Sequence, residues 1–344
     1  MQGVLITDPY SLRYYTGFCG GEGIALCTKE EAVLYVDSRY TEAAAGEVKD
    51  AASGFIVREY NHDAPLFDQL RDQLTKASAE TVGFEDRSMV CSTFTKYHKE
   101  LGCRLIPLED ALLIPRQIKT DAELAYLRKA EAIGDQAFSH ILTVLKPGIT
   151  ELEVAAELEY TMKKCGAGGL SFDTIVASGI HSSMPHAIPT EKKLENGDFV
   201  TMDFGCIYKG YCSDMTRTVV IGKASAEQRK VYETVLQAQL AAMEGLRPGM
   251  QCREVDTIAR DLIRDAGYGE YFGHGLGHSV GLYIHESPAL NTRDETVLVP
   301  GMIETIEPGI YIPGFGGVRI EDMGVVTREG YESFATSRKE LIEV

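Results

Sequence analysis

Two pairs of acidic residues flank two turn-like segments in the C-terminal half of the sequence. Asp203 and Asp214 lie on β-like runs on either side of Tyr208–Tyr211, and the midpoint of the pair, 208.5, falls within that turn. Residues equidistant from the turn of an antiparallel hairpin face each other on one side of the sheet. Glu307 and Glu321 repeat this arrangement, with their midpoint at 314 in a glycine-rich turn. Each hairpin is therefore predicted to supply one pair of facing carboxylates.

Four converging carboxylates would repel one another unless cations neutralised them. Oxygen ligands with one imidazole suit divalent ions such as Mn²⁺, Co²⁺ or Fe²⁺. The candidate imidazoles are His274, His278 and His285. The first two have the four-residue spacing of a zinc-protease helix, but Gly275 and Gly277 oppose a helix and no glutamate follows His274. A single aspartate beside a turn is usually a solvated edge charge, whereas two symmetric pairs with a glycine-flanked double histidine predict a two-metal site.

Helix-start signals precede these strands. Thr120–Glu123, Thr150–Glu153 and Ser225–Gln228 have the pattern of capping boxes, in which the first and fourth side chains bond each other's backbone N–H groups. A fourth helix is expected to begin at Gln251, where no small hydroxyl cap is present but the apolar spacing is helical.

The same region contains an internal repeat. Leu145-Lys146-Pro147-Gly148 recurs 101 residues later as Leu246-Arg247-Pro248-Gly249. An ordered series then recurs at an offset of 104: Gly197, Thr201, Asp203 and Gly205 correspond to Gly301, Thr305, Glu307 and Gly309. The C-terminal domain is therefore predicted to contain two related units, each of helix, helix and hairpin.

Residues 1–116 alternate between strand-like and helix-like segments, and the pattern breaks around Pro115–Gln117. We therefore expect an α/β domain over residues 1–116 and a second domain over residues 117–344. The expected strands are Gly3–Thr7, Gly23–Cys27, Ala32–Asp37 and Thr81–Glu85, and the expected helices are Tyr40–Glu47, Ala64–Lys76 and Ser92–Leu101.

Composition excludes several classes of protein. The chain of 344 residues carries 34 basic and 51 acidic side chains, a net charge of −17 that disfavours nucleic-acid binding. No apolar run approaches the length of a membrane span, and the first residues lack signal-peptide character. The eight cysteines include no CxxC pair, so we expect free, mostly buried thiols in a cytoplasmic protein.

Together these motifs resemble the M24 metallopeptidases of the pita-bread fold, in the branch of Xaa-Pro aminopeptidases and prolidases (Xaa-Pro dipeptidases), along essentially the whole chain. The matching segments are Ser183–His186, Met202–Gly205, Ser213–Arg217, His274–His278, His285–Pro288, Glu307–Tyr311 and Arg319–Asp322. The resemblance implies an α/β (α+β) fold, with a creatinase/prolidase-like N-terminal domain followed by a pita-bread catalytic domain that has an internal pseudo-two-fold repeat.

The resemblance also implies a role for each residue of the site. Asp203 would bind one metal, Asp214 and Glu321 would bridge both, and His278 and Glu307 would bind the second. Two cations, most simply Mn²⁺ with Co²⁺, Fe²⁺ or Zn²⁺ as alternatives, would lower the pKa of a bridging water that attacks the Xaa-Pro carbonyl.

The remaining roles concern proton transfer and substrate binding. Glu307 would carry a proton from the water to the prolyl nitrogen, and His186 and His285 would hydrogen-bond the carbonyl and the oxyanion. Arg319 would also orient Glu321. Three residues would line the pocket for the proline ring and the residue beyond it: His274, Tyr311 and Arg319.

The resemblance implies an Xaa-Pro aminopeptidase that acts on short proline-containing peptides, as a homodimer. The segment Asp37–Glu42 favours the aminopeptidase over a prolidase that cuts only dipeptides. Two further alternatives remain, a non-catalytic binding module on the same fold and a metal-independent amidinohydrolase of the creatinase type. The complete set of five ligand residues opposes the binding module.

Overall fold

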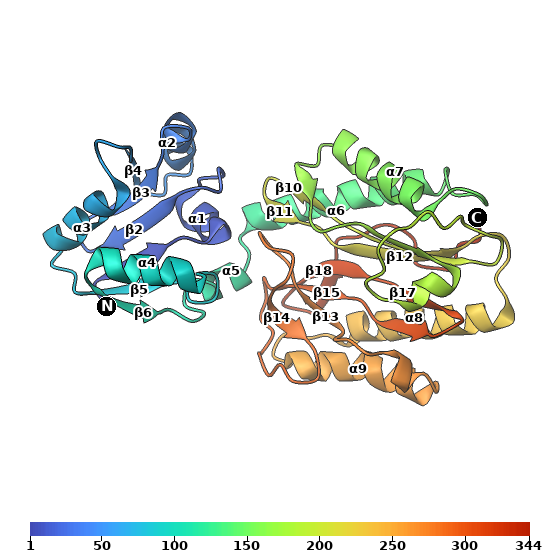
Figure 1. Ribbon diagram of the computed structural model, residues 1–344. Coiled ribbons are helices and arrows are strands. Elements are labelled where there is room, and N and C mark those ends of the chain that lie inside the picture. The colour runs from blue at the N-terminus through green and yellow to red at the C-terminus, as the bar shows by residue number, and fades with distance from the viewer. The chain divides into compact units, whose positions relative to one another are not determined.

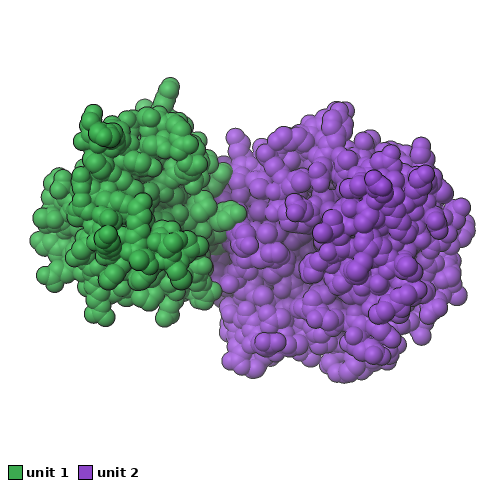
Figure 2. All heavy atoms as spheres, in the orientation of Figure 1, with its two compact units in different colours: residues 1–116 green, residues 117–344 purple.

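A computed structural model describes residues 1–344 and separates them into two compact units, Met1–Arg116 and Gln117–Val344 (Figure 2). None of its helices is both long enough and apolar enough to cross a membrane. None of the eight cysteines forms a disulfide bond, but only three of them are buried and two are exposed, so the expectation of mostly buried thiols is wrong.

The first unit is built on a six-stranded mixed sheet in the order β4-β3-β2-β1-β5-β6. Alternate side chains of its strands enter two different cores, so that Leu5 packs on one face and Ile6 on the other. Its strands are β1 (Gly3–Ile6), β2 (Ile24–Thr28), β3 (Ala32–Val36), β4 (Ile56–Glu59), β5 (Thr81–Phe84) and β6 (Arg104–Pro107). Its helices are α1 (Pro9–Thr16), α2 (Thr41–Asp50), α3 (Leu66–Lys76) and α4 (Cys91–Leu101).

Most segments predicted in the first unit are confirmed, and the missed ones have physical reasons. The strands β4 and β6 lie at the two edges of the sheet, where side chains are less buried and the apolar signal is weak. The helix α1 has only eight residues, and its start is marked by Asp8, whose side chain accepts from two backbone N–H groups, and by Pro9.

The second unit contains two helix pairs with strands between them (Figure 1). Its helices are α5 (Ile114–Gln117, across the boundary), α6 (Asp121–Ile141), α7 (Glu151–Lys164), α8 (Ala226–Gly245) and α9 (Cys252–Asp265), with 3₁₀ turns η1 (Gly179–Ser183) and η2 (Gly269–Tyr271). Its strands are β7 (Gly169–Leu170), β8 (Ile175–Ser178), β9 (Phe199–Phe204), β10 (Cys206–Tyr208), β11 (Tyr211–Cys212), β12 (Met215–Val220), β13 (Gly277–Ser279), β14 (Glu286–Leu290), β15 (Ile303–Ile306), β16 (Gly309–Ile312), β17 (Gly316–Arg319), β18 (Asp322–Val326) and β19 (Tyr331–Ser333).

The two halves of this unit have the same order of elements. In the first half α6 and α7 precede the β9–β12 ladder, which is interrupted by the hairpin β10–β11. In the second half α8 and α9 precede the β15–β18 ladder, interrupted by β16–β17. Each half has its own apolar core. A single β-bridge between Thr216 and Glu321 joins the first ladder to the second.

The helix starts of this unit follow the sequence signals. The capping boxes at Thr120, Thr150 and Ser225 are all formed. At Gln251, which has no hydroxyl, the side chain of Glu254 accepts from the Gln251 N–H at 2.7 Å. Side-chain hydrogen bonds therefore fix where all four long helices begin.

The register of the two hairpins agrees with the prediction in one case only. Gly309 pairs with Arg319 and Ile306 with Asp322, so the second hairpin is centred at 314 and places Glu307 opposite Glu321. In the first hairpin Asp203 pairs with Thr216 rather than Asp214, because the turn is the two-residue Lys209–Gly210, with both residues at positive φ. Asp214 lies two residues away, which keeps it diagonal to Asp203 on the same face.

Close backbone approach at Gly205 holds the first hairpin in this register. A Cβ built there would lie 2.0 Å from the carbonyl oxygen of Ser213. We expect Gly205→Ala to lower the free energy of unfolding by about 1–3 kcal/mol, since the strands must separate. Gly134→Ala, in the helix α6, is the matched control, because its Cβ would meet only ordinary contacts at 3.6 and 3.8 Å and should stabilise the protein by about 0.5–1 kcal/mol. Thermal unfolding of the two variants should shift in opposite directions.

Candidate metal centre

A cavity of about 460 Å³ in the second unit contains nearly all the residues that the sequence singles out. The carboxylates come from both halves of the unit: Asp203 is the last residue but one of β9, and Asp214, Glu307 and Glu321 lie between consecutive strands. The lining includes Asp203, Asp214, His278, Glu307 and Glu321, together with His186, His274, His285 and Arg319.

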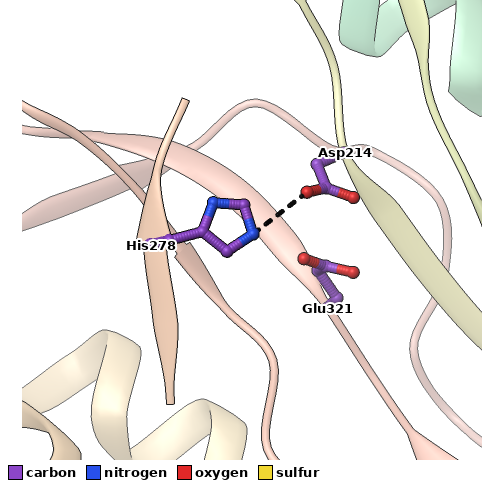
Figure 3. A group of neighbouring side chains, drawn as sticks. All are labelled: Asp214, His278 and Glu321. Atoms are coloured by element: carbon purple, nitrogen blue, oxygen red, sulfur yellow. Dashed lines mark ion pairs between the residues drawn. The ribbon is translucent and has the colours of Figure 1, made fainter. Parts of the chain in front are cut away.

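Three of these side chains form a compact group of possible metal ligands. One ligand atom each from Asp214, His278 and Glu321 lies within 4.8 Å of the others, and the three side chains point toward one another (Figure 3). Nε2 of His278 is 3.4 Å from an oxygen of Asp214 and 3.4 Å from an oxygen of Glu307. The side chain of His278, on β13, therefore faces one carboxylate from each hairpin.

The backbone sets the orientation of the His278 ring. Its Nδ1 lies 3.1 Å from the carbonyl oxygen of Ser279. A carbonyl can only accept, so Nδ1 carries the proton and Nε2 presents a lone pair to the carboxylates. Burial lowers the pKa of His278 below its ordinary value, which favours the neutral ring that a metal requires.

The carboxylates of the cavity are destabilised as anions. Burial, followed by repulsion from the neighbouring carboxylates, raises the pKa of Asp214 and Glu321 well above their ordinary values. Burial also raises the pKa of Glu307 to about 7. Oδ1 of Asp203 and Oε1 of Glu321 are buried without a hydrogen-bond partner. Buried anionic oxygens that lack donors fit divalent cations, which would neutralise them and complete their coordination.

Arg319 is the one cation that contacts this carboxylate group directly. It donates to Asp203 at 2.5 Å and to the hydroxyl of Thr216 at 3.0 Å. Thr216 in turn donates to Glu321 at 2.6 Å. Arg319 is thus hydrogen-bonded to Asp203, and it reaches the carboxylate of Glu321 through the threonine hydroxyl rather than by a bond of its own.

Tyr311 connects Arg319 to His274. Its hydroxyl oxygen accepts from Arg319 at 2.8 Å and lies 3.0 Å from Nε2 of His274. Nδ1 of His274 is 2.7 Å from the carbonyl oxygen of Gly275, so Nε2 accepts from Tyr311. Burial lowers the pKa of His274 to about 4, which keeps this ring neutral. Tyr311 is absent from the cavity lining and lies behind the two side chains that it contacts.

The other two histidines line the cavity and are exposed. The ring of His285 packs edge-on against His278, with 4.6 Å between centroids. His186 follows Pro185, whose carbonyl oxygen accepts from Arg319 at 3.3 Å. The loop that carries His186 is anchored by the buried Glu151, which accepts from the backbone N–H groups of residues 178 and 190.

Sequence reasoning gave no role to two threonines that hold the carboxylates. Thr305 donates to Glu307 at 3.0 Å and its hydroxyl accepts from the backbone N–H of His278. Thr216 lies two residues after Asp214, as Thr305 lies two residues before Glu307. A side chain two positions away on a strand shares the same face, so this spacing was the signal that could have identified both.

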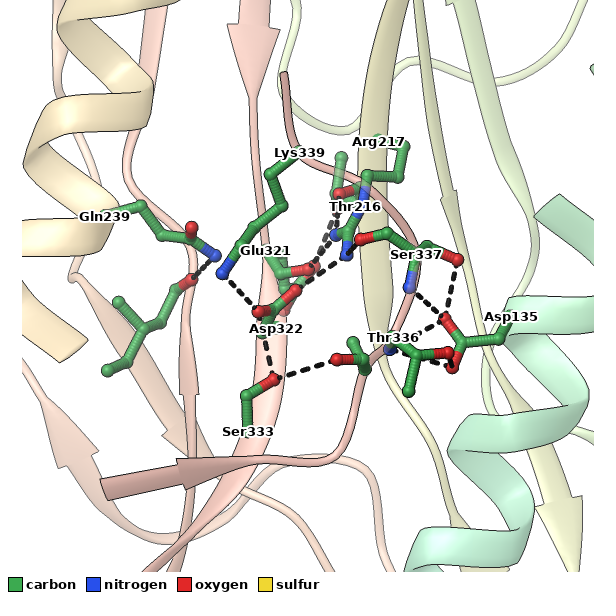
Figure 4. Close-up of polar contacts among 12 residues, drawn as sticks. Asp135, Thr216, Arg217, Gln239, Glu321, Asp322, Ser333, Thr336, Ser337 and Lys339 are labelled. Carbon is green, nitrogen blue, oxygen red and sulfur yellow. Dashed lines mark hydrogen bonds and ion pairs between the residues drawn. The ribbon is translucent and has the colours of Figure 1, made fainter. Parts of the chain in front are cut away.

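A buried network behind the cavity fixes the backbone that joins the two ladders (Figure 4). Arg217 donates to the carbonyl oxygens of Thr216 and Glu321 and to the carboxylate of Asp322. Burial opposes ionisation of Asp322, but Arg217 and Lys339 outweigh it and lower its pKa. The guanidinium group of Arg217, on β12, therefore hydrogen-bonds both residues of the Thr216–Glu321 β-bridge and stabilises it.

Comparison with known proteins agrees with this geometry. Residues 125–328, more than half of the chain, match the metallopeptidase family M24, and residues 1–118 match the creatinase/prolidase N-terminal domain. This chain belongs to the M24 metallopeptidases. The α/β fold predicted from the motifs, with a creatinase-type N-terminal domain and an M24 catalytic domain, is therefore confirmed.

Relatives of this M24 chain with named activities fall into two groups. An Xaa-Pro dipeptidase from Pyrococcus furiosus is 40% identical over 98% of this chain and 94% of its own length. The structure of an Xaa-Pro dipeptidase from Bacillus anthracis is 44% identical, covers 100% of this chain and 95% of its own, and has a TM-score of 0.96. The structure of an X-Pro aminopeptidase from Thermotoga maritima is 36% identical, covers 100% and 98%, and has a TM-score of 0.93.

Removal of the Thr216 hydroxyl should weaken the metal centre. Thr216→Val leaves one oxygen of Glu321 and Nε of Arg319 without this partner, and we expect Mn²⁺ affinity to fall by about 10–100-fold. Thr174→Val is the control, because the hydroxyl of Thr174 is buried without a partner and its loss should cost nothing. Calorimetric titration with Mn²⁺ measures both, and equal affinities in the two variants would contradict the assignment.

Proposed function

We propose that this M24 metallopeptidase hydrolyses the Xaa-Pro bond at the N-terminus of short peptides. The observation that carries the proposal is the group formed by Asp214, His278 and Glu321, with ligand atoms within 4.8 Å of one another in a cavity that Asp203 and Glu307 also line. The names of the relatives, which divide between dipeptidases and an aminopeptidase, support a substrate with proline in the second position.

Asp203, Asp214, His278, Glu307 and Glu321 would hold two divalent cations, for which Mn²⁺ is our choice. When bound, the cations supply a water of lowered pKa that acts as the nucleophile. This hard-ion choice rests on the donor set of four carboxylates and one imidazole.

The side chains of the protein would then bind the substrate and move the proton. Glu307 accepts the proton of the attacking water on a carboxylate oxygen and delivers it to the prolyl nitrogen as the carbon–nitrogen bond breaks. His186 and His285 donate to the substrate carbonyl and to the developing oxyanion. His274, held neutral by burial and oriented by Tyr311, borders the space for the proline ring and the residue beyond it.

A specific feature supports substrates longer than a dipeptide. A second hollow of about 560 Å³ shares His274, Gly275 and Asn291 with the cavity, so the two hollows adjoin at these residues. In the proposed function, a peptide that extends past proline would pass from the cavity into this neighbouring hollow. The competing function is a prolidase restricted to dipeptides, which the 40–44% identity to named Xaa-Pro dipeptidases favours.

Substrate length separates the two functions. With Mn²⁺ present, we expect turnover of Ala-Pro-Ala with release of free alanine, measured by chromatography of the products. Ala-Ala-Ala is the matched control and should remain intact, because it lacks proline. The dipeptide Ala-Pro is tested alongside them. If only Ala-Pro is cleaved, the protein is a prolidase and not an aminopeptidase; if none of the three peptides is cleaved, the Xaa-Pro assignment is wrong.

Loss of one carboxylate from the metal group should abolish most of the activity. For Asp214→Asn and Glu321→Gln we expect kcat/KM to fall by about 100-fold or more. Loss of a side chain that would bind the metal directly should cost more than loss of a residue that only hydrogen-bonds such a side chain. Asp63→Asn removes a fully exposed carboxylate and should leave kcat/KM unchanged.

Chelation decides between the proposal and its metal-independent alternatives. Treatment with a chelator should abolish hydrolysis, and Mn²⁺ should restore it. Activity that survives chelation would indicate chemistry of the creatinase type. A chain that binds Mn²⁺ and proline peptides without cleaving them would be a binding module.

A further inference from the structure

A fully buried lysine, Lys119, contacts the residues that follow His278 and His285. The side chain of Lys119 is 1% exposed, and its Nζ lies 3.3 Å from the hydroxyl oxygen of Ser279 and 3.3 Å from a carboxylate oxygen of Glu286. Its own backbone N–H donates to Gly301 at 2.9 Å, which fixes the start of the side chain. An ammonium group buried to this extent is costly unless it is paired and positioned.

The two residues that Lys119 contacts are cross-strand partners. Ser279 ends β13 and pairs with Glu286, the first residue of β14, so the pair closes the loop of residues 280–285. The strand pairing shifts register between His278 and Ser279, so the ladder is irregular at this point. Lys119 therefore links the two ends of this loop. It does so at the point where the irregular strand pairing defines the backbone positions least.

Glu286 also organises the inside of this loop. Its carboxylate accepts from the backbone N–H of Tyr283 at 3.2 Å. It packs so closely on Gly281 that a Cβ there would lie 2.4 Å from Oε2, the oxygen that faces Lys119. Lys119 thus fixes the position of the Glu286 carboxylate, against which the loop of residues 280–285 packs.

Each hydrogen-bond partner of the Lys119 ammonium group lies one residue after a histidine of the site. Ser279 follows His278, and its carbonyl oxygen is the acceptor that leaves Nε2 of His278 unprotonated. Glu286 follows His285, whose ring packs on that of His278. A displacement of the Ser279–Glu286 pair would therefore move both rings.

We propose that Lys119 is a positioning residue of the metal centre: it clamps Ser279 to Glu286 and thereby holds His278 in the orientation and tautomer that present Nε2 to a metal ion. The role of His285 in this inference rests on the proposed function. The role of His278 is tested by metal binding alone, without a substrate.

The test combines Mn²⁺ titration calorimetry with ¹⁵N-histidine NMR of the metal-free protein, in which the His278 signal is identified by its loss in His278→Asn. In Lys119→Met we expect Mn²⁺ affinity to fall about tenfold, as is typical for the loss of an outer partner, and the His278 signal to report a mixture of tautomers. Lys119→Arg, which keeps the charge, should recover part of the affinity. Lys192→Met removes another lysine–carboxylate pair, with Asp198, and should change neither reading.

A double variant separates positioning from simple charge pairing. Lys119→Met leaves the carboxylate of Glu286 buried without its ammonium partner, and Lys119→Met/Glu286→Gln removes that charge. We expect the double variant to regain thermal stability but not Mn²⁺ affinity. Recovery of both would overturn the proposal, because Lys119 would then only neutralise Glu286.

A milder variant covers the case in which Lys119→Met does not fold. Ser279→Ala keeps the Lys119–Glu286 pair and removes only the hydroxyl, so we expect a several-fold loss of Mn²⁺ affinity with an altered His278 signal. Wild-type affinity and signal in Ser279→Ala would overturn the proposal. A wild-type protein that binds Mn²⁺ but cleaves no Xaa-Pro peptide would contradict the proposed function and leave the positioning role standing.

Discussion

The mutual repulsion of four carboxylates in one cavity is the constraint around which the second unit is organised. Asp203, Asp214, Glu307 and Glu321 all line it, and burial makes their negative charges more costly than in water. Arg319 supplies one fixed positive charge and two cations would supply the rest. A fold that gathers these groups must hold the backbone rigidly, because relaxation would let the carboxylates move apart.

The duplicated architecture provides that rigidity. Each half contributes a three-stranded sheet packed on its own pair of helices, and the carboxylates lie close to where these sheets meet their hairpin tips. The Thr216–Glu321 bridge joins the halves, and Arg217 binds the backbone on both sides of it. The C-terminal segment strengthens the same place, since the carbonyl of Ser337 accepts from Arg217 while its N–H donates to Asp135 on α6.

The histidines enter the cavity from a different part of the fold and need separate support. β13 and β14 form a short two-stranded sheet with an irregular register, so backbone pairing alone specifies the rings poorly. The hydroxyl of Thr305, next to the carboxylate of Glu307, accepts from the N–H of His278. The clamp that we propose at Lys119 would act on the same strand one residue further along, at Ser279. The proposed metal centre would thus depend on side chains, Thr305 and Lys119, that do not line the cavity.

The sequence by itself singled out the acidic side chains that line the cavity and predicted that each pair shares one face of its hairpin. Acidic residues at matched distances from two turns predicted opposed carboxylates, and the helix caps and the repeat predicted the elements that carry them, because these signals can be read along the chain without knowing how it packs. It could not determine the register at Lys209–Gly210, where a two-residue turn moved the partner of Asp203 to Thr216. Only the tertiary structure decided that Arg319 bonds Asp203, 116 residues away, and that Lys119 reaches Ser279, 160 residues away. Such contacts depend on how the two halves pack, which no local pattern encodes.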